Sequence, residues 1–153
     1  GWRITASPVL WMGFSAATRH FLAVHMTFGA VNEWTTQAAY ARLASECDHP
    51  VLSELLRRIM KQEGRHIDFY LDQARRHLEP AAAQRTTRFM LRKVWSPVGS
   101  SVMPVDETRH LARSLFADDA GHAMLERIDR RIDRLPGLDG LGLLQGAFTR
   151  LAA

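Results

Sequence analysis

The chain has 153 residues, of which 46% are hydrophobic and 24% are charged, and its formal net charge is +4. This length allows one domain with a buried core, and the composition is ordinary for a soluble protein. The only cysteine, Cys47, excludes an internal disulfide framework, and no apolar run is long enough to span a membrane. No secretory signal is visible, so we expect a cytoplasmic protein whose positive charge favours acidic partners.

Residues 1–14 form an apolar and aromatic N-terminal segment that follows no helical period. We expect this segment to lie on a larger apolar surface, which could belong to protein outside this chain. Residues 15–135 are predicted to form the helical domain, and residues 136–153 a glycine-rich C-terminal tail that becomes weakly helical. Because no strand pattern and no internal repeat are found, the expected fold class is all-α.

The first long helix is predicted from Ser15, a suitable N-cap, to about Cys47. Its apolar residues recur every three or four positions, and Glu33 occupies the same stripe. Gly29 and Ala30 lie one turn before Glu33, where they leave room for a neighbouring helix or a ligand. A carboxylate in an apolar stripe is costly to bury alone, so a partner for Glu33 is expected nearby.

The second long helix is predicted from Pro50 to about Glu79, after a short break. Because the connection is short, the two helices are expected to be antiparallel neighbours. Glu63 and His66 stand one turn apart in the apolar stripe of this helix, so both point the same way. Gly64 between them has two interpretations: a tolerated mid-helix glycine, or the close approach of another helix.

Three shorter helices are predicted over residues 80–95, 106–116 and 118–135, with a loop at 96–101. The first of them contains no acidic residue. Its basic residues are Arg85, Arg88, Arg92 and Lys93. We expect this basic face to be exposed to solvent and to receive an acidic partner, with a solvated face that has no partner as the alternative.

Glu33 together with Glu63-x-x-His66 is the strongest functional pattern in the sequence. Iron and manganese accept mixed carboxylate and imidazole ligands. A two-metal site in a four-helix bundle takes one Glu from each of two helices and a Glu-x-x-His from each of the other two. The pattern here supplies one half of that set. The alternative is an internal salt-bridge network with one of three basic residues: Arg19, Arg42 or Arg65.

Two further pairs have the same spacing, Glu107-x-x-His110 and Asp119-x-x-His122. Each lies at the edge of its apolar stripe, so a solvated or capping pair is the preferred interpretation of both. The remaining ligands of a two-metal site would then have to come from residues outside Glu33, Glu63 and His66 of one chain. A homodimer would bring two half-sets together, and a missing N-terminal half before Gly1 would supply the other ligands.

Asn32-Glu33-Trp34-Thr35-Thr36 followed by Gln62-Glu63-Gly64-Arg65-His66 resembles the ligand helices of the ferritin-like di-iron carboxylate proteins. The nearest branch is the soluble acyl-carrier-protein desaturases (type 2 fatty acid desaturases), and the resemblance covers roughly residues 20–104. It implies that Glu33, Glu63 and His66 are metal ligands from the second half of the family's ligand set. It also implies that Thr36, one turn after Glu33, lies beside the oxygen site.

The resemblance implies a ferritin-like antiparallel helix bundle, with a long helix pair and shorter helices packed beside it. The implied function is that of a di-iron, oxygen-dependent oxidoreductase or desaturase, or one half of one. Iron is the implied cofactor, with manganese as the alternative, and an acidic acyl carrier protein is the implied partner. Two other classes stay open: a metal-free helical interaction module, and, less expected, a basic helical nucleic-acid binder whose binding would depend on salt.

Overall fold

The computed structural model describes residues 19–100 and 102–152, and this part contains six α-helices and no strand. The helices are α2 (Phe21–Glu46), α3 (Pro50–His77), α4 (Ala81–Lys93), α5 (Val105–Phe116), α6 (Asp119–Ile132) and α7 (Leu143–Ala152). The prediction of an all-α fold is therefore confirmed. The predicted N-cap Ser15 and the apolar segment 1–14 lie outside the described residues. No helix in the described part combines the length and the apolar character that a membrane crossing needs.

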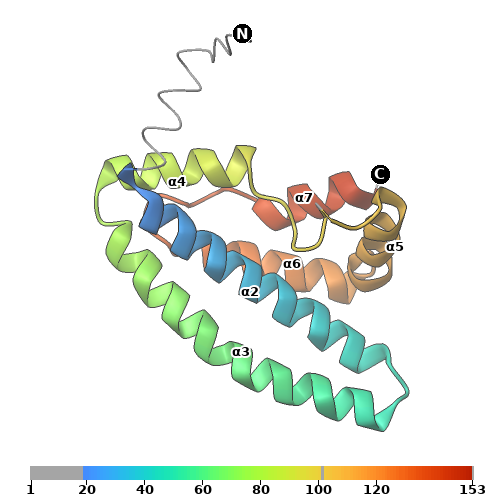
Figure 1. Ribbon diagram of the computed structural model, residues 1–153. Helices are drawn as coiled ribbons and strands as arrows, with labels where there is room; N and C mark the ends of the chain where they lie inside the picture. Colours follow the sequence, from blue (N-terminus) through green and yellow to red (C-terminus); the bar gives the residue numbers. More distant parts are fainter. Residues whose placement is uncertain (1–18, 101, 153) are drawn as a thin grey trace, which may run out of the picture.

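Helices α2 and α3 form the predicted antiparallel pair, joined by a short connection (Figure 1). His49 caps α3, because its Nδ1 atom accepts a hydrogen bond from the backbone N–H of Leu52 at 3.2 Å. Pro50 follows in the first turn, where a missing N–H donor costs nothing. Helix α3 packs chiefly on α2, so much of its surface faces solvent. The pair is therefore covered by the other described helices chiefly on the side of α2.

Helix α2 is central, because α3 packs on one side of it and α4, α5 and α6 pack on the other (Figure 1). The sequence predicts one apolar stripe on this helix. In the structure, most of the buried residues of α2 lie outside that stripe. The buried residues of α2 are Ala23, Thr27, Ala30, Val31, Trp34, Thr35 and Arg42. A helix that is apolar on every side is typically buried between neighbours. The two buried threonines donate their hydroxyl protons to backbone carbonyls one turn earlier, at 2.7 and 2.8 Å, and so need no other partner.

The C-terminal residues that the sequence sets apart as a tail contribute to the main core. Leu144 is fully buried, and the rings of Phe148 and Phe116 meet edge to face at 4.7 Å. The buried carboxylate of Asp129 on α6 caps α7, accepting the backbone N–H groups of Leu144 at 2.9 Å and Gln145 at 3.1 Å. A helix as short as α7 is marginal alone, and these contacts supply its stability.

Gly29 and Gly64 have opposite surroundings at the interface of the long pair. A Cβ atom added at Gly29 would lie 2.4 Å from ring carbons of Tyr70, so α3 approaches α2 closely there. A Cβ atom added at Gly64 would meet nothing within 4 Å among the described residues. The room that the sequence predicts at Gly29 is therefore used by a neighbouring helix. No described element approaches Gly64, which leaves the interpretation of a tolerated glycine.

These surroundings predict opposite effects of two alanine substitutions. We expect Gly64→Ala to raise the free energy of unfolding by roughly 0.5–1 kcal/mol, because alanine restricts the unfolded chain and suits a helix. Gly29→Ala should lower it by about 1–2 kcal/mol, because the Tyr70 ring would have to move. Urea unfolding with unchanged m values measures both. A destabilising Gly64→Ala would show instead that protein outside the described residues packs at this position.

Candidate metal centre

Glu33 on α2 and Glu63 and His66 on α3 come together at the interface of the long pair. One donor atom from each of the three side chains lies within 4.8 Å of the others. Nδ1 of His66 and Oε2 of Glu63 are 2.9 Å apart. The convergence follows from the antiparallel packing, since residues one turn apart on α3 face the same neighbour. The structure therefore brings the predicted residues together, and metal ligation by them stays a prediction.

The surroundings of Glu33 raise the pKa of this carboxyl group above its ordinary value. Burial raises the pKa of Glu33, and a hydrogen bond and charge repulsion from Glu63 raise it further, while the His66 charge opposes the change. Two carboxylates held close together repel each other, and an opposite charge between them relieves that repulsion. A divalent metal ion would supply this charge. The donor set thus fits a cation that accepts oxygen and nitrogen ligands.

The alternative of an internal salt-bridge network around these carboxylates is not found. No ion pair in the described part of the chain joins an arginine or lysine to Glu33 or Glu63. Arg42, one of the candidates, instead pairs with Glu46 and Asp118. Within the described residues, the basic side chain that contacts this carboxylate pair is therefore His66.

The cluster is open to solvent on the side of His66. The His66 side chain is 60% exposed and that of Glu63 is 21% exposed. Leu55 and Phe69, which are 52% and 55% exposed, share the side of α3 that carries His66 by their helical spacing. An exposed apolar face beside an open donor set is typical of a surface that receives more protein. Iron and manganese in oxygen-rich sites prefer about six ligands, so three donors leave the site incomplete.

Thr36 lines an apolar cavity of about 180 Å³. The other walls come from α5, α7 and the loop after α4, and they include Met103, Leu111 and Phe148. Thr36 follows Glu33 by one turn of α2, but Glu33, Glu63 and His66 are not among the residues that line this cavity. Its role at an oxygen site stays a prediction.

The other Glu-x-x-His patterns behave as the sequence predicts. Glu107, His110, Asp119 and His122 are all exposed. Among residues 19–100 and 102–152, the only group of three or more potential metal-binding side chains is the cluster at Glu33. These four residues are therefore solvated side chains in this structure.

The basic face of α4 is only partly solvated, which corrects the prediction at Arg88. Arg85, Arg92 and Lys93 are exposed. Arg88 is half-buried and donates hydrogen bonds to the carbonyl oxygens of Gly137 at 3.1 Å and Asp139 at 2.8 Å. This side chain therefore holds the chain between α6 and α7 against α4. The partner carbonyls are far away in sequence, so no local pattern could have indicated the contact.

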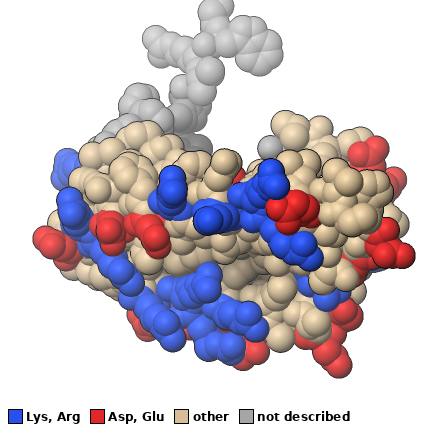
Figure 2. Space-filling model, turned by 90° about the horizontal axis from the view of Figure 1, so that it is seen from below, with Lys and Arg blue, Asp and Glu red and all other residues tan. Residues whose placement is uncertain are grey.

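A second concentration of positive charge was missed by sequence reasoning. A groove of about 570 Å³ between α3 and α6 is lined on one side by Lys61, Arg65 and Arg75 and on the other by Arg131 and Arg134. On the face shown in Figure 2, Lys and Arg side chains gather on both sides of a hollow. Charges on separate helices meet here only through the tertiary fold, so the sequence carries no local signal for the groove.

Comparison with known proteins gives no match to a family model, to a curated protein or to a solved structure. The resemblance to the di-iron carboxylate proteins therefore stands on the sequence around Glu33, Thr36, Glu63 and His66. To this the structure adds the convergence of three donor atoms, the raised pKa of Glu33 and an apolar cavity that Thr36 lines.

Proposed function

We propose that this chain binds a transition metal through Glu33, Glu63 and His66 and functions as an oxygen-dependent di-iron oxidoreductase, or as one half of one. The observation that carries the proposal is the convergence of the three donor atoms within 4.8 Å. Iron is the proposed metal and manganese the alternative, because both accept carboxylate oxygens together with imidazole nitrogen. When bound, the metal would supply the chemistry of oxygen activation.

The residues of this chain would have distinct roles in such a site. Glu33 and Glu63 offer carboxylate oxygens, and His66 offers a ring nitrogen that its contact with Glu63 already holds beside them. The cavity beyond Thr36 has an apolar lining, which suits an apolar portion of a substrate and excludes water from it. A fatty acyl chain, as in the family that the sequence resembles, has this chemistry.

Completion of the site requires further ligands. A second copy of the chain would add another Glu33, Glu63 and His66, which together make the four carboxylates and two histidines of a two-metal bundle site. The exposed side chains Leu55 and Phe69 beside His66 support the docking of further helices there. A preceding N-terminal half would cover the same face. The resemblance also implies an acidic acyl carrier protein as a partner, and the positive net charge of the chain is compatible with one.

Elemental analysis of the purified chain tests this proposal. We expect iron to co-purify with the protein and its amount to rise with assembly, so that two metal ions accompany a pair of chains rather than a monomer. Light scattering on the same sample gives the assembly state. Two tightly bound ions per monomeric chain would contradict the need for completion.

The exposed apolar face also favours a second candidate function, a helical interaction module that binds no metal. The two candidates differ in their response to chelation. A metal-binding protein should lose thermal stability when a chelator removes the ion, because binding to the folded state alone stabilises it. An interaction module should contain no metal and unfold at the same temperature with or without the chelator.

A further inference from the structure

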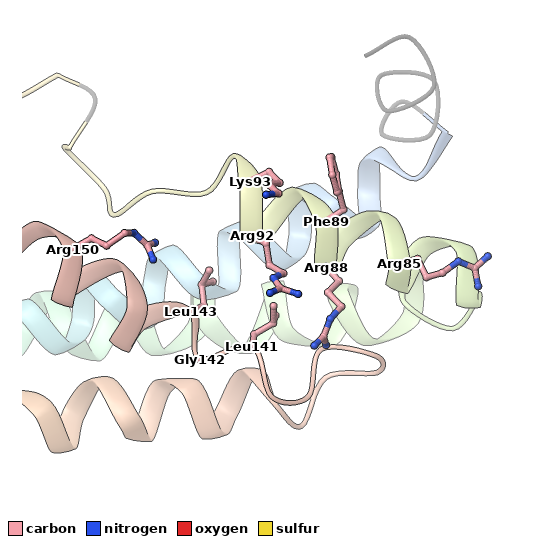
Figure 3. A pocket seen from close by; sticks show the side chains of 9 residues that line it. All are labelled: Arg85, Arg88, Phe89, Arg92, Lys93, Leu141, Gly142, Leu143 and Arg150. Atoms are coloured by element: carbon pink, nitrogen blue, oxygen red, sulfur yellow. The ribbon is translucent and has the colours of Figure 1, made fainter. Parts of the chain in front are cut away.

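A cleft between α4 and α7 gathers positive charge from both helices (Figure 3). Its volume is about 660 Å³, and the chain at 141–143 forms part of its wall. The basic side chains that line it are Arg85, Arg88, Arg92, Lys93 and Arg150. No Asp or Glu belongs to the lining that the described residues form. Such a concentration of one sign of charge raises the local concentration of anions.

Arg92 and Arg150 are the two side chains best placed to hold a ligand. In Figure 3, Arg92 points from α4 toward Leu141, and Arg150 points from α7 into the cleft on the side of Leu143. Neither guanidinium makes an ion pair or hydrogen bond with any residue the structure describes. Arg88 differs, because its bonds to two backbone carbonyls hold the wall of the cleft. The free guanidinium groups therefore retain all their donors for a ligand.

The geometry favours phosphate over a single carboxylate. A guanidinium donates two parallel hydrogen bonds to a phosphate, so several such groups lining one cleft can bind a ligand with several charged oxygens. The volume of the cleft falls within the usual range for small-molecule sites. Phe89, 52% exposed, and Leu141 add apolar surface next to the charges. A concave site built from two helices suits a compact ligand better than the flat face of an acidic protein.

We propose that this cleft binds a small organic phosphate, with the phosphate groups between Arg92 and Arg150 and an apolar or aromatic portion against Phe89 and Leu141. This site is separate from the metal cluster and needs none of its residues. The sequence expectation of an acidic protein partner on α4 is a competing occupant. The two differ in size, since a small ligand fits within the cleft and a protein must cover the surface around it.

Isothermal titration calorimetry with three probes tests the proposal: inorganic pyrophosphate, adenosine diphosphate and a polyglutamate peptide. The full chain is used with a chelator present, so that the result does not depend on the metal cluster. We expect both phosphate probes to bind at low salt, the nucleotide more tightly because it adds an aromatic group. Arg92→Ser and Arg150→Ser should each weaken binding by about tenfold or more, the loss typical of a charge-assisted hydrogen bond.

A matched control separates a site from general charge attraction. Arg58→Ser removes one positive charge from α3, where Arg58 is exposed and, among the residues that the structure describes, pairs with Glu54. It should change binding of the phosphate probes less than about twofold, the scale of an exposed pair. Circular dichroism confirms that each variant is folded. Equal weakening by all three variants, no binding of either phosphate probe, or binding of polyglutamate alone would overturn the proposal.

Discussion

Glu33→Gln should weaken iron binding by the purified chain by about a hundredfold, since even residues that only support metal ligands change affinity by 10–100-fold. The amide keeps the shape of the side chain but cannot offer a charged oxygen. Glu63→Gln and His66→Gln should have effects of the same order, because the donors of all three side chains lie within 4.8 Å of one another. Competition titration against a colorimetric chelator measures the affinities.

The thermal stability of the metal-free Glu33→Gln variant shows whether Glu33 is a metal ligand or a residue that the fold itself needs. Burial and Glu63 raise the pKa of Glu33, so ionisation of this group opposes folding. Its unfavourable contribution to the free energy of unfolding is absent below the ordinary carboxyl pKa. This contribution grows as the pH rises through the raised pKa of the folded state. In a chelator at neutral pH, Glu33→Gln should therefore unfold at the same temperature as the wild type or above it.

A matched control for these variants is available in the exposed pair Glu107 and His110. Glu107→Gln makes the same chemical change at a solvated position outside the cluster. We expect it to leave both iron affinity and thermal stability unchanged. If Glu33→Gln binds iron as tightly as the wild type, the metal site is not at this cluster.

The long helix pair and the cluster were predictable because their signals are local. The break before Pro50 and the apolar spacing of each helix indicate two antiparallel helices, and α2 and α3 are found there. Glu63 and His66 converge by helical geometry alone. Their meeting with Glu33 needs only the register of two neighbouring helices, which a short connection largely sets.

The packing of α2 against the other helices was not predictable from its own sequence. Its apolar residues occur on all sides, so no single stripe marks the core face. Trp34 and Thr35 are buried although neither belongs to the predicted stripe, and their burial depends on the shorter helices that pack on α2. Which helix covers which face depends on contacts between segments far apart in the chain.

The packing of the C-terminal residues 136–151 into the core was also not predictable from their own sequence. The glycines before α7 and its short length indicate a weakly structured tail. The stabilising contact comes from the buried Asp129 on α6, which accepts the N–H groups of Leu144 and Gln145. Arg150 reaches the cleft beside α4 only because α7 packs in this way. A cap supplied by a distant helix leaves no local sequence signature.

Arg42→Met should lower the free energy of unfolding by about 2–3 kcal/mol, because it removes a buried donor that links α2 to the end of α5 and the start of α6. The guanidinium of Arg42 is buried between α2, α5 and α6. Its Nε atom donates to the carbonyl oxygen of Leu115 at 2.9 Å, and Nη2 lies 2.6 Å from a carboxylate oxygen of Asp118. Methionine fills a similar volume but leaves the Leu115 carbonyl without this donor. Urea unfolding at neutral pH measures the change.

The pH dependence of the same variant identifies the ion pair. Hydrogen bonding to the Gly121 N–H and then to Arg42 holds the pKa of Asp118 below its ordinary value of 3.8. The stability that this carboxylate contributes is present above the ordinary value and is lost as the pH falls through the lowered one. In Arg42→Met the loss on acidification should be smaller, since the hydrogen bond and the charge of Arg42 no longer lower the pKa of Asp118. Arg58→Met removes an exposed arginine and should change stability by less than about 0.5 kcal/mol. Equal effects of the two methionine variants would show that Arg42 does not link α2 to the rest of the fold.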